Sequence, residues 1–219
     1  MKAFVAGATG ETGRRIVAEL VRRNIPVRAL VRSTEKAAQI LPAQTELVTG
    51  DVLNIDSIRA AIGDCTVLLS ATGAAPSFDP TGPYKVDYEG TKNLIDVAKE
   101  KNIEQFVMVS SLCTSKLLHP LNLFFLILVW KKRAEEYLQA SGVPYTIVRP
   151  GGLTNEDENA DSIVMSSADT LFDGRIARIK VAQVCVEALT NPTAKNKIVE
   201  IVAKAEAPSR DFADLFAGV

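Results

Sequence analysis

The sequence is poor in the residues that build metal sites and disulfide frameworks. It has one histidine and three cysteines, and Cys65, Cys113 and Cys185 lie far apart without a C-x-x-C pair. Zinc binding and a disulfide scaffold are therefore not expected, and no metal ligand is assigned. An odd number of dispersed cysteines instead indicates reduced thiols in a reducing compartment.

An excess of charge of either sign is also missing. The 25 Lys and Arg residues are balanced by 26 Asp and Glu residues, which gives a formal net charge of −1. This balance offers no electrostatic case for nucleic acid or for an anionic membrane surface. With 47% hydrophobic and 23% charged residues, the composition is that of a soluble globular protein with a sizeable core.

Hydrophobic runs long enough to cross a bilayer are absent. The longest, Leu123–Trp130, is far shorter than the roughly 20 residues that a spanning helix needs. The first residues have the pattern of a strand followed by a glycine-rich turn, which a signal peptide would not have. We therefore expect a cytoplasmic protein without a transmembrane span.

What the chain does contain is a glycine-rich turn near residue 10, with the spacing G-x-x-G-x-x-G. The apolar run Lys2–Ala6 predicts a buried strand before it, and the stripe that starts at Ile16 predicts a helix after it. In such a turn, Gly7 permits the tight exit from the strand, Gly10 lets a pyrophosphate approach the backbone, and Gly13 lets helix and strand pack closely. The N–H groups at the helix start would face the anion. Because strand and helix flank it on the correct sides, we interpret the turn as a dinucleotide phosphate loop.

Strand and helix patterns alternate along the rest of the chain. Parallel strands need crossover connections, so this alternation predicts an α/β fold, a Rossmann-like doubly wound parallel sheet with helices on both faces. We expect residues 1–219 to form a single NAD(P)-binding domain with a small variable substrate-side region around 151–180, and the acidic segment 155–161 to be a mobile loop. Strands are expected at 26–31, 46–48, 66–71, 105–110, 145–149 and 198–202, and helices at 34–41, 56–62, 83–101, 134–140 and 180–190.

The apolar run at 117–130 has two interpretations. A short apolar run often begins a buried helix. It can equally form an exposed apolar patch that contacts a partner or the edge of a membrane, in which case Leu123–Trp130 is the contact.

The residue at the end of the second strand indicates which nicotinamide cofactor binds. NAD sites place an acidic residue there, about 20 residues after the glycines, to bind the ribose 2′-hydroxyl. This chain has Arg32 instead, which can pair with a 2′-phosphate through charge-assisted hydrogen bonds, with help from Arg14. The acidic rival, Glu35, fits better as a first-turn residue of the next helix. We therefore expect NADP(H).

Taken together, these motifs identify the chain as similar to the atypical short-chain dehydrogenase/reductases, in the short NAD(P)-binding branch. That branch includes biliverdin reductase B-like flavin reductases and proteins of cyanobacteria and chloroplasts. The resemblance runs from Met1 to about Val202. It is carried by Gly7–Gly13, Leu30–Arg32, Gly50–Val52, Val86–Leu94, Val109–Ser111, and the stretch from Lys131 through Glu135 to Tyr145–Leu153.

The resemblance implies a set of cofactor contacts along the carboxyl ends of the strands. The first loop would hold the pyrophosphate, Arg32 the 2′-phosphate, and the later segments the adenine, the ribose and the nicotinamide. The implied cofactor-binding residues are Gly7, Thr9, Gly10, Glu11, Thr12, Gly13, Arg32, Asp51, Val52, Ala71, Thr72, Gly73, Ser110, Lys131, Pro150, Gly151, Gly152 and Leu153. Ser111 and Lys131 occupy the places of catalytic residues.

One departure from the family pattern bears on the reaction. Active members carry a proton-donating tyrosine four residues before the lysine, and here Ile127 holds that place. Tyr137 and Tyr145 have the wrong spacing and are expected to serve in packing, and His119 to be a loop or packing residue. Two function classes remain open. The first is an NADPH-dependent reductase that transfers hydride to a planar conjugated acceptor, such as a flavin or biliverdin. The second is a non-catalytic NADP(H)-binding redox sensor or assembly protein.

Overall fold

The computed structural model describes residues 1–75, 79–156 and 161–219. They contain a ten-stranded sheet with strand order β3-β2-β1-β4-β5-β6-β10-β9-β7, with β8 pairing on β10. The strands from β3 to β6 are parallel neighbours, and β10 extends this parallel set beside β6. The strands are β1 (Ala3–Ala6), β2 (Val27–Val31), β3 (Glu46–Thr49), β4 (Val67–Ser70), β5 (Gln105–Val109), β6 (Tyr145–Pro150), β7 (Gly152–Thr154), β8 (Ser162–Ser167), β9 (Arg175–Ala177) and β10 (Lys197–Lys204).

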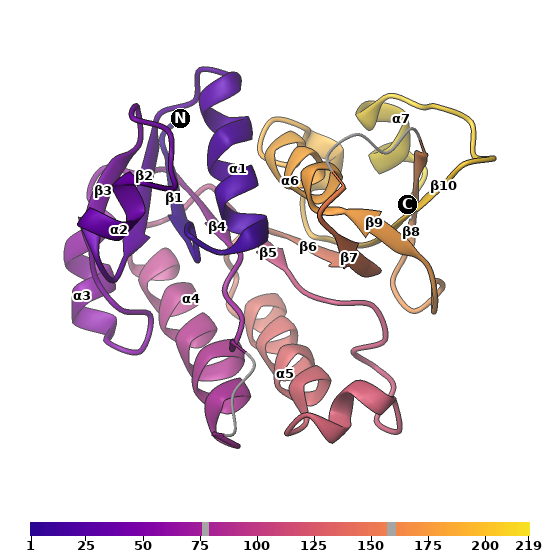
Figure 1. Cartoon of the computed structure of the whole chain (residues 1–219), viewed down its shortest axis with the longest axis horizontal. Helices are drawn as coiled ribbons and strands as arrows, with labels where there is room; N and C mark the ends of the chain where they lie inside the picture. The colour runs from indigo at the N-terminus through magenta and orange to yellow at the C-terminus, as the bar shows by residue number, and fades with distance from the viewer. Residues whose placement is uncertain (76–78, 157–160) are drawn as a thin grey trace.

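Helices cover both faces of this sheet, as the strand–helix alternation predicted (Figure 1). The helix α1 packs beside α6 on one face, and α3, α4 and α5 lie on the other. The helices are α1 (Glu11–Arg22), α2 (Thr34–Ala38), α3 (Ile55–Ala61), α4 (Thr91–Glu100), α5 (Ile127–Ala140), α6 (Arg178–Glu187) and α7 (Phe212–Ala217), and a π-helical stretch, Tyr84–Gly90, leads directly into α4.

The pleat of the central strand divides the core into two layers. In β1, Ala3 and Val5 pack into the cluster under α1 and α6, whereas Phe4 and Ala6 pack into the cluster under α3, α4 and α5. All four side chains are fully buried, as expected for a strand covered on both faces. The predicted doubly wound α/β fold is confirmed.

The region after β6 contains more regular structure than the sequence indicated. The strands β8 and β9 pair antiparallel with β10, and β7 pairs parallel with β9. None of these short strands, nor α7, was expected, because each depends on pairing or packing with a segment far along the chain. The expected acidic loop at 155–161 lies in large part outside the described residues.

The helix α5 begins earlier than the sequence suggested. It starts at Ile127 rather than near Ala134 and buries Leu128 in its first turn. The preceding residues do not form a buried helix start, because the chain from Leu117 to Leu126 is mostly exposed and contains only a 3₁₀ turn, Pro120–Leu123. No helix among the described residues is both long and apolar enough to span a bilayer.

The three cysteines are free and buried. Burial raises the pKa of the Cys65 thiol to about 11, so at neutral pH it stays protonated and a poor nucleophile.

Candidate functional site

The glycine-rich turn between β1 and α1 is sterically closed on its inner side. Gly7 has φ +76°, and a Cβ added there would lie 2.5 Å from the carbonyl oxygen of Ala71, which follows β4. A Cβ on Gly13 would lie 2.0 Å from the Gly7 carbonyl oxygen. Both positions therefore require glycine, for the turn and helix packing that the motif predicted.

Gly10 differs, because its outer side is open. A Cβ added there would meet only the Gly7 carbonyl oxygen, at 3.3 Å. Gly10 is also the N-cap of α1, and no side chain caps that helix start. The first N–H groups of α1 are thus left for an outside acceptor, which fits a pyrophosphate.

The charges around this helix start are nearly balanced. Thr12 is buried, whereas Thr9 and Glu11 are exposed. The carboxylate of Glu11 pairs with Arg14 at 2.7 Å and with Arg15 at 3.0 Å. The hydrogen bond from Arg15 lowers the pKa of Glu11, and the two arginines offset the repulsion that this carboxylate would exert on a phosphate.

Arg32 follows β2 directly, and its side chain is exposed. The rival acid, Glu35, lies in the first turn of α2 and accepts a hydrogen bond from the Ser33 hydroxyl at 2.8 Å. Glu35 is therefore a first-turn residue of α2, as expected. Arg32 is the basic residue at the position that distinguishes NADP sites from NAD sites.

The ends of β3 and β4 place the next expected residues on the same edge of the sheet. Asp51 accepts the Leu53 N–H at 2.9 Å, and the carbonyl of Val52 accepts from Asn93 at 2.9 Å. After β4, the Thr72 hydroxyl lies 3.0 Å from that of Ser70, between Ala71 and the exposed Gly73. Parallel strands share one carboxyl edge, so these segments lie along the same edge of the sheet as the phosphate loop.

Lys131 has a partner that the sequence analysis did not select. Its Nζ lies 2.7 Å from the Oδ1 of Asp87, whose side chain is fully buried in the π-helical stretch. The other carboxylate oxygen of Asp87 accepts the Ala74 N–H at 3.1 Å. Asp87 thus connects the lysine of α5 to the loop after β4. The only signal in the sequence was an acidic residue between Val86 and Tyr88.

The two serines after β5 have different environments. The Ser110 hydroxyl is buried and donates to Glu135 at 2.5 Å, so it faces the interior. Ser111 is only partly buried. Ile127 packs beside a small apolar cluster that includes Leu112 and Leu128, so the usual place of the tyrosine is apolar.

A buried ionic cluster supports this end of the site, and sequence reasoning missed it. The fully buried Arg149 of β6 pairs with Glu135 of α5 at 2.6 Å and with Glu200 of β10 at 3.2 Å. It also pairs with the half-exposed Asp169 at 2.9 Å. Glu200 in turn accepts backbone N–H groups from residues 169–171. The cluster fixes α5, and with it Lys131, against the sheet.

The segment expected at the nicotinamide begins at the carboxyl end of β6 and continues into β7. Pro150 ends β6, and Gly151 donates its N–H to Ile201 at 2.9 Å. A Cβ on Gly151 would lie 2.5 Å from the Gly174 carbonyl oxygen, so this turn requires glycine. Gly152 and Leu153 begin β7.

The remaining expected residues have structural contacts of their own. The Tyr137 hydroxyl donates to Asp96 at 2.6 Å, and Tyr145 accepts from Gln139 at 3.4 Å. His119 accepts the Leu121 N–H at 3.2 Å and caps the 3₁₀ turn.

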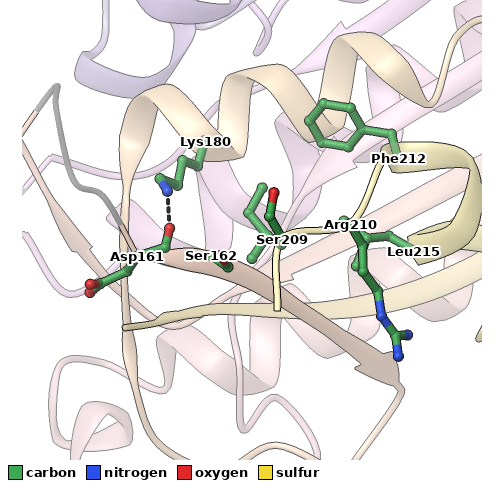
Figure 2. A pocket seen from close by; sticks show the side chains of 8 residues that line it. Asp161, Ser162, Lys180, Ser209, Arg210, Phe212 and Leu215 are labelled. Carbon is green, nitrogen blue, oxygen red and sulfur yellow. Dashed lines mark hydrogen bonds between the residues drawn. The ribbon is translucent and has the colours of Figure 1, made fainter. Parts of the chain in front are cut away.

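A cavity of about 180 Å³ lies elsewhere, between β8, α6 and α7 (Figure 2). Lys180 donates to the backbone carbonyl of Asp161 at its wall. Its volume is below the ~300 Å³ typical of ligand pockets, and it holds none of the expected cofactor contacts.

The fold and the phosphate loop together define a dinucleotide-binding protein of the Rossmann-like class. The model of the NAD(P)H-binding family matches residues 7–192. The chain belongs to this family, within the atypical short-chain dehydrogenase/reductases, as the motifs indicated.

Individual relatives agree with this assignment. The chain is 46% identical to an uncharacterized chloroplastic protein of Arabidopsis thaliana, over 100% of the chain and 82% of the relative. It is 39% identical to the chloroplastic protein TIC 62 of Pisum sativum, over 94% of the chain but only 43% of the relative. It is 32% identical to the sanguinarine reductase of Eschscholzia californica, over 99% and 95%. A solved structure of a putative NAD-dependent epimerase/dehydratase from Bacillus halodurans has a TM-score of 0.88, with 26% identity and full coverage of both chains.

These relatives correct one expectation. Cytoplasmic location was inferred from dispersed cysteines and an N-terminal strand, but several of the similar proteins are chloroplastic. The assignment to the cytoplasm is therefore wrong. Dispersed thiols indicate a reducing environment and do not distinguish one such compartment from another.

Proposed function

We propose that this protein is an NADPH-dependent reductase that passes a hydride to a planar conjugated acceptor. One observation carries the proposal. The family's lysine is present as Lys131, but the apolar Ile127 occupies the position of the proton-donating tyrosine. Lys131 is held at 2.7 Å from Asp87, while Ile127, one turn earlier on α5, packs among Leu112 and Leu128.

The contacts of Lys131 support a binding role. Its ammonium group is mostly buried and faces the carboxylate of Asp87, beside the loop after β4. The resemblance implies that the cofactor ribose would lie at that loop. Lys131 would hold the ribose hydroxyls, and Asp87 would keep the lysine in position.

Among the described residues, the alternative proton donors weighed from the sequence are engaged elsewhere, and this limits the acceptor. The hydroxyls of Tyr137 and Tyr145 are used elsewhere in the fold, and His119 caps a turn. General acid catalysis is worth roughly 10²–10⁴-fold, so reduction of an isolated carbonyl to an alcohol would be slow here. When bound, the nicotinamide would supply a hydride, and a conjugated acceptor would delocalise the added charge until water protonates it. Such an acceptor needs less help from an acid.

The preference for NADPH rests on Arg32. This exposed arginine directly follows β2, and the nearby Glu35 accepts a hydrogen bond from Ser33. A guanidinium at this place favours a 2′-phosphate over a hydroxyl. We further propose that the region 151–180, which contains β7, β8 and β9, lines the acceptor side of one cofactor-binding unit.

Similarity to a sanguinarine reductase supports a reductase function, although the acceptor of this chain is a separate question. The test is turnover of NADPH with flavins, quinones and biliverdin, and with simple secondary alcohols plus NADP⁺ as the opposite case. We expect slow reduction of at least one conjugated acceptor and no alcohol oxidation. Brisk alcohol oxidation would overturn our interpretation of Ile127.

Two variants assign the roles. Ser111→Ala should slow acceptor reduction while NADPH binding stays normal, because the partly exposed Ser111 would orient the acceptor or a water. Lys131→Ala should weaken NADPH binding. Ser209→Ala and Lys99→Ala change exposed residues away from the site and serve as matched controls.

The second candidate function is a non-catalytic NADP(H)-binding sensor or assembly protein. The apolar residue at position 127 and the similarity to TIC 62 favour it. Tight NADPH binding without reduction of any member of the panel would select it over the reductase.

A further inference from the structure

The described structure gathers its exposed hydrophobic side chains in one short segment. Seven of the twelve large hydrophobic residues that are exposed lie between Leu117 and Leu126. They are Leu117, Leu118, Leu121, Leu123, Phe124, Phe125 and Leu126. We call this segment, residues 117–126, the apolar loop. A contiguous group of exposed apolar side chains marks an interaction surface.

The apolar loop contains left-handed backbone and is closed by hydrogen bonds of the Asn122 side chain. Phe125 and Leu126 have φ of +55° and +59°, left-handed conformations that bulky residues rarely adopt. Asn122 accepts the Leu128 N–H at 3.0 Å and donates to the Leu117 carbonyl at 2.8 Å. Because these bonds close the loop on itself, its leucines and phenylalanines point outward instead of folding onto α5. The loop lies at an outer end of the molecule, where the chain enters α5 (Figure 1).

The charged residues that flank the loop in the sequence are all basic. From Gln105 to Ala134 the sequence contains no Asp or Glu, yet it has Lys116 before the loop and Lys131, Lys132 and Arg133 after it. Lys116 lies over the Phe172 ring at 3.5 Å, and Arg133 lies near the Trp130 ring at 5.2 Å. The acids nearby are Asp87, which pairs with Lys131, Glu136, which lies 3.8 Å from Lys132, Asp169, which also interacts electrostatically with Lys132, and Asp173, which follows Phe172.

We propose that the apolar loop inserts into the surface of an anionic lipid membrane, with Lys116, Lys132 and Arg133 contacting lipid headgroups. A projecting set of leucines and phenylalanines flanked by basic residues is the arrangement by which proteins bind the headgroup region without crossing the bilayer. The balanced net charge of the whole chain concealed this local separation. The proposal is independent of the reductase function, because it concerns binding to lipid and not turnover.

The test is co-sedimentation of the full chain with vesicles of phosphatidylcholine containing phosphatidylglycerol, compared with vesicles of phosphatidylcholine alone. The wild type should bind the anionic vesicles more tightly, and added salt should weaken the binding. The triple variant Leu118→Ser, Leu123→Ser, Phe124→Ser changes side chains that are 97%, 85% and 65% exposed. It should fold normally and lose about tenfold or more in vesicle affinity.

Matched variants distinguish binding through this surface from non-specific binding through other exposed apolar or basic side chains. Ile40→Ser with Leu53→Ser alters two side chains that are each 45% exposed but lie elsewhere, and should bind as the wild type does. Lys132→Gln with Arg133→Gln should lose about fivefold for each charge on anionic vesicles, whereas Lys99→Gln with Lys101→Gln should not.

Two results would overturn the proposal. One is a wild type that binds neither kind of vesicle, or a triple-serine variant that binds as well as the wild type. The other is self-association in analytical ultracentrifugation that the triple-serine variant abolishes, without vesicle binding, which would make the loop an interface between copies of this chain.

Discussion

At the scale of single residues, the glycines of the glycine-rich turn differ in why glycine is needed. Gly7 and Gly13 have no room for a side chain, because an added Cβ would come within 2.5 and 2.0 Å of backbone oxygens. Gly10 has an ordinary backbone, with φ −72° and ψ 164°, and an added Cβ would make one close contact, 3.3 Å from the Gly7 carbonyl oxygen. Glycine is therefore required at positions 7 and 13 for the backbone to fold in this way. At position 10 it keeps the space in front of the helix start open.

This contrast predicts opposite outcomes for two substitutions. Gly10→Val should abolish NADPH binding and leave thermal unfolding nearly unchanged, since valine tolerates extended backbone and fills the pyrophosphate space. Gly13→Ala should instead destabilise the fold by about 1–3 kcal/mol through overcrowding. Nicotinamide fluorescence titration and thermal denaturation of both variants provide the measurements. Normal NADPH affinity in folded Gly10→Val would contradict the placement of the site.

At the scale of elements, α1 and α6 are joined by an ionic clamp as well as by packing. Arg23 lies 2.7 Å from both Glu19 of α1 and Glu187 of α6. Burial raises the pKa of Glu19, but the hydrogen bonds from Arg22 and Arg23 outweigh it and leave the pKa below its ordinary value. The clamp braces the helix whose start forms the phosphate loop.

A carboxylate with a depressed pKa gives stability that is present above the unfolded-state value of about 4.3 and is lost as the pH falls through the folded-state value. Glu19→Gln should therefore lower the free energy of unfolding by about 1–3 kcal/mol at pH 7. The difference from the wild type should shrink below about pH 4. Urea unfolding from pH 3 to 7 measures this, with Glu136→Gln, an exposed glutamate of α5, as the control. An equal difference at pH 3 and pH 7 would show that charge is not the cause.

At the scale of the whole molecule, the proposed cofactor contacts come from strand ends spread over most of the chain. The phosphate loop follows β1, Arg32 follows β2, and Lys131 reaches the loop after β4 through Asp87. A ligand that contacts all of them binds the folded chain and not the unfolded one. It should therefore raise global stability by mass action, by about 2.7 kcal/mol at a hundredfold excess over its Kd.

The size of this stabilisation should depend on the 2′-phosphate. NADPH should raise Tm more than NADH at equal concentration, because a charge-assisted contact to Arg32 is worth about 1.5–3 kcal/mol. In Arg32→Ala the two cofactors should give equal shifts, while Lys99→Ala should behave as the wild type. Differential scanning fluorimetry measures the shifts, and equal shifts in the wild type would reject NADPH preference.

The sequence by itself determined the features that depend on neighbours along the chain. The phosphate loop, the main alternating strands and helices and the first-turn position of Glu35 follow from spacing, glycine positions and apolar periodicity, which act over a few residues. The family followed from the same local motifs. Ile127 in place of tyrosine was also visible, because the family pattern fixes its distance from Lys131.

Tertiary structure alone decided the features that join distant segments. Arg149 pairs with Glu135 and Glu200, which lie 14 and 51 residues away in the sequence. Asp87 of the π-helical stretch pairs with Lys131 of α5. The strands β8 and β9 exist because β10 supplies hydrogen-bond partners. The run at 117–130 could be buried or exposed on its pattern alone, because hydrophobicity states a preference and only packing determines whether another surface is present to satisfy it.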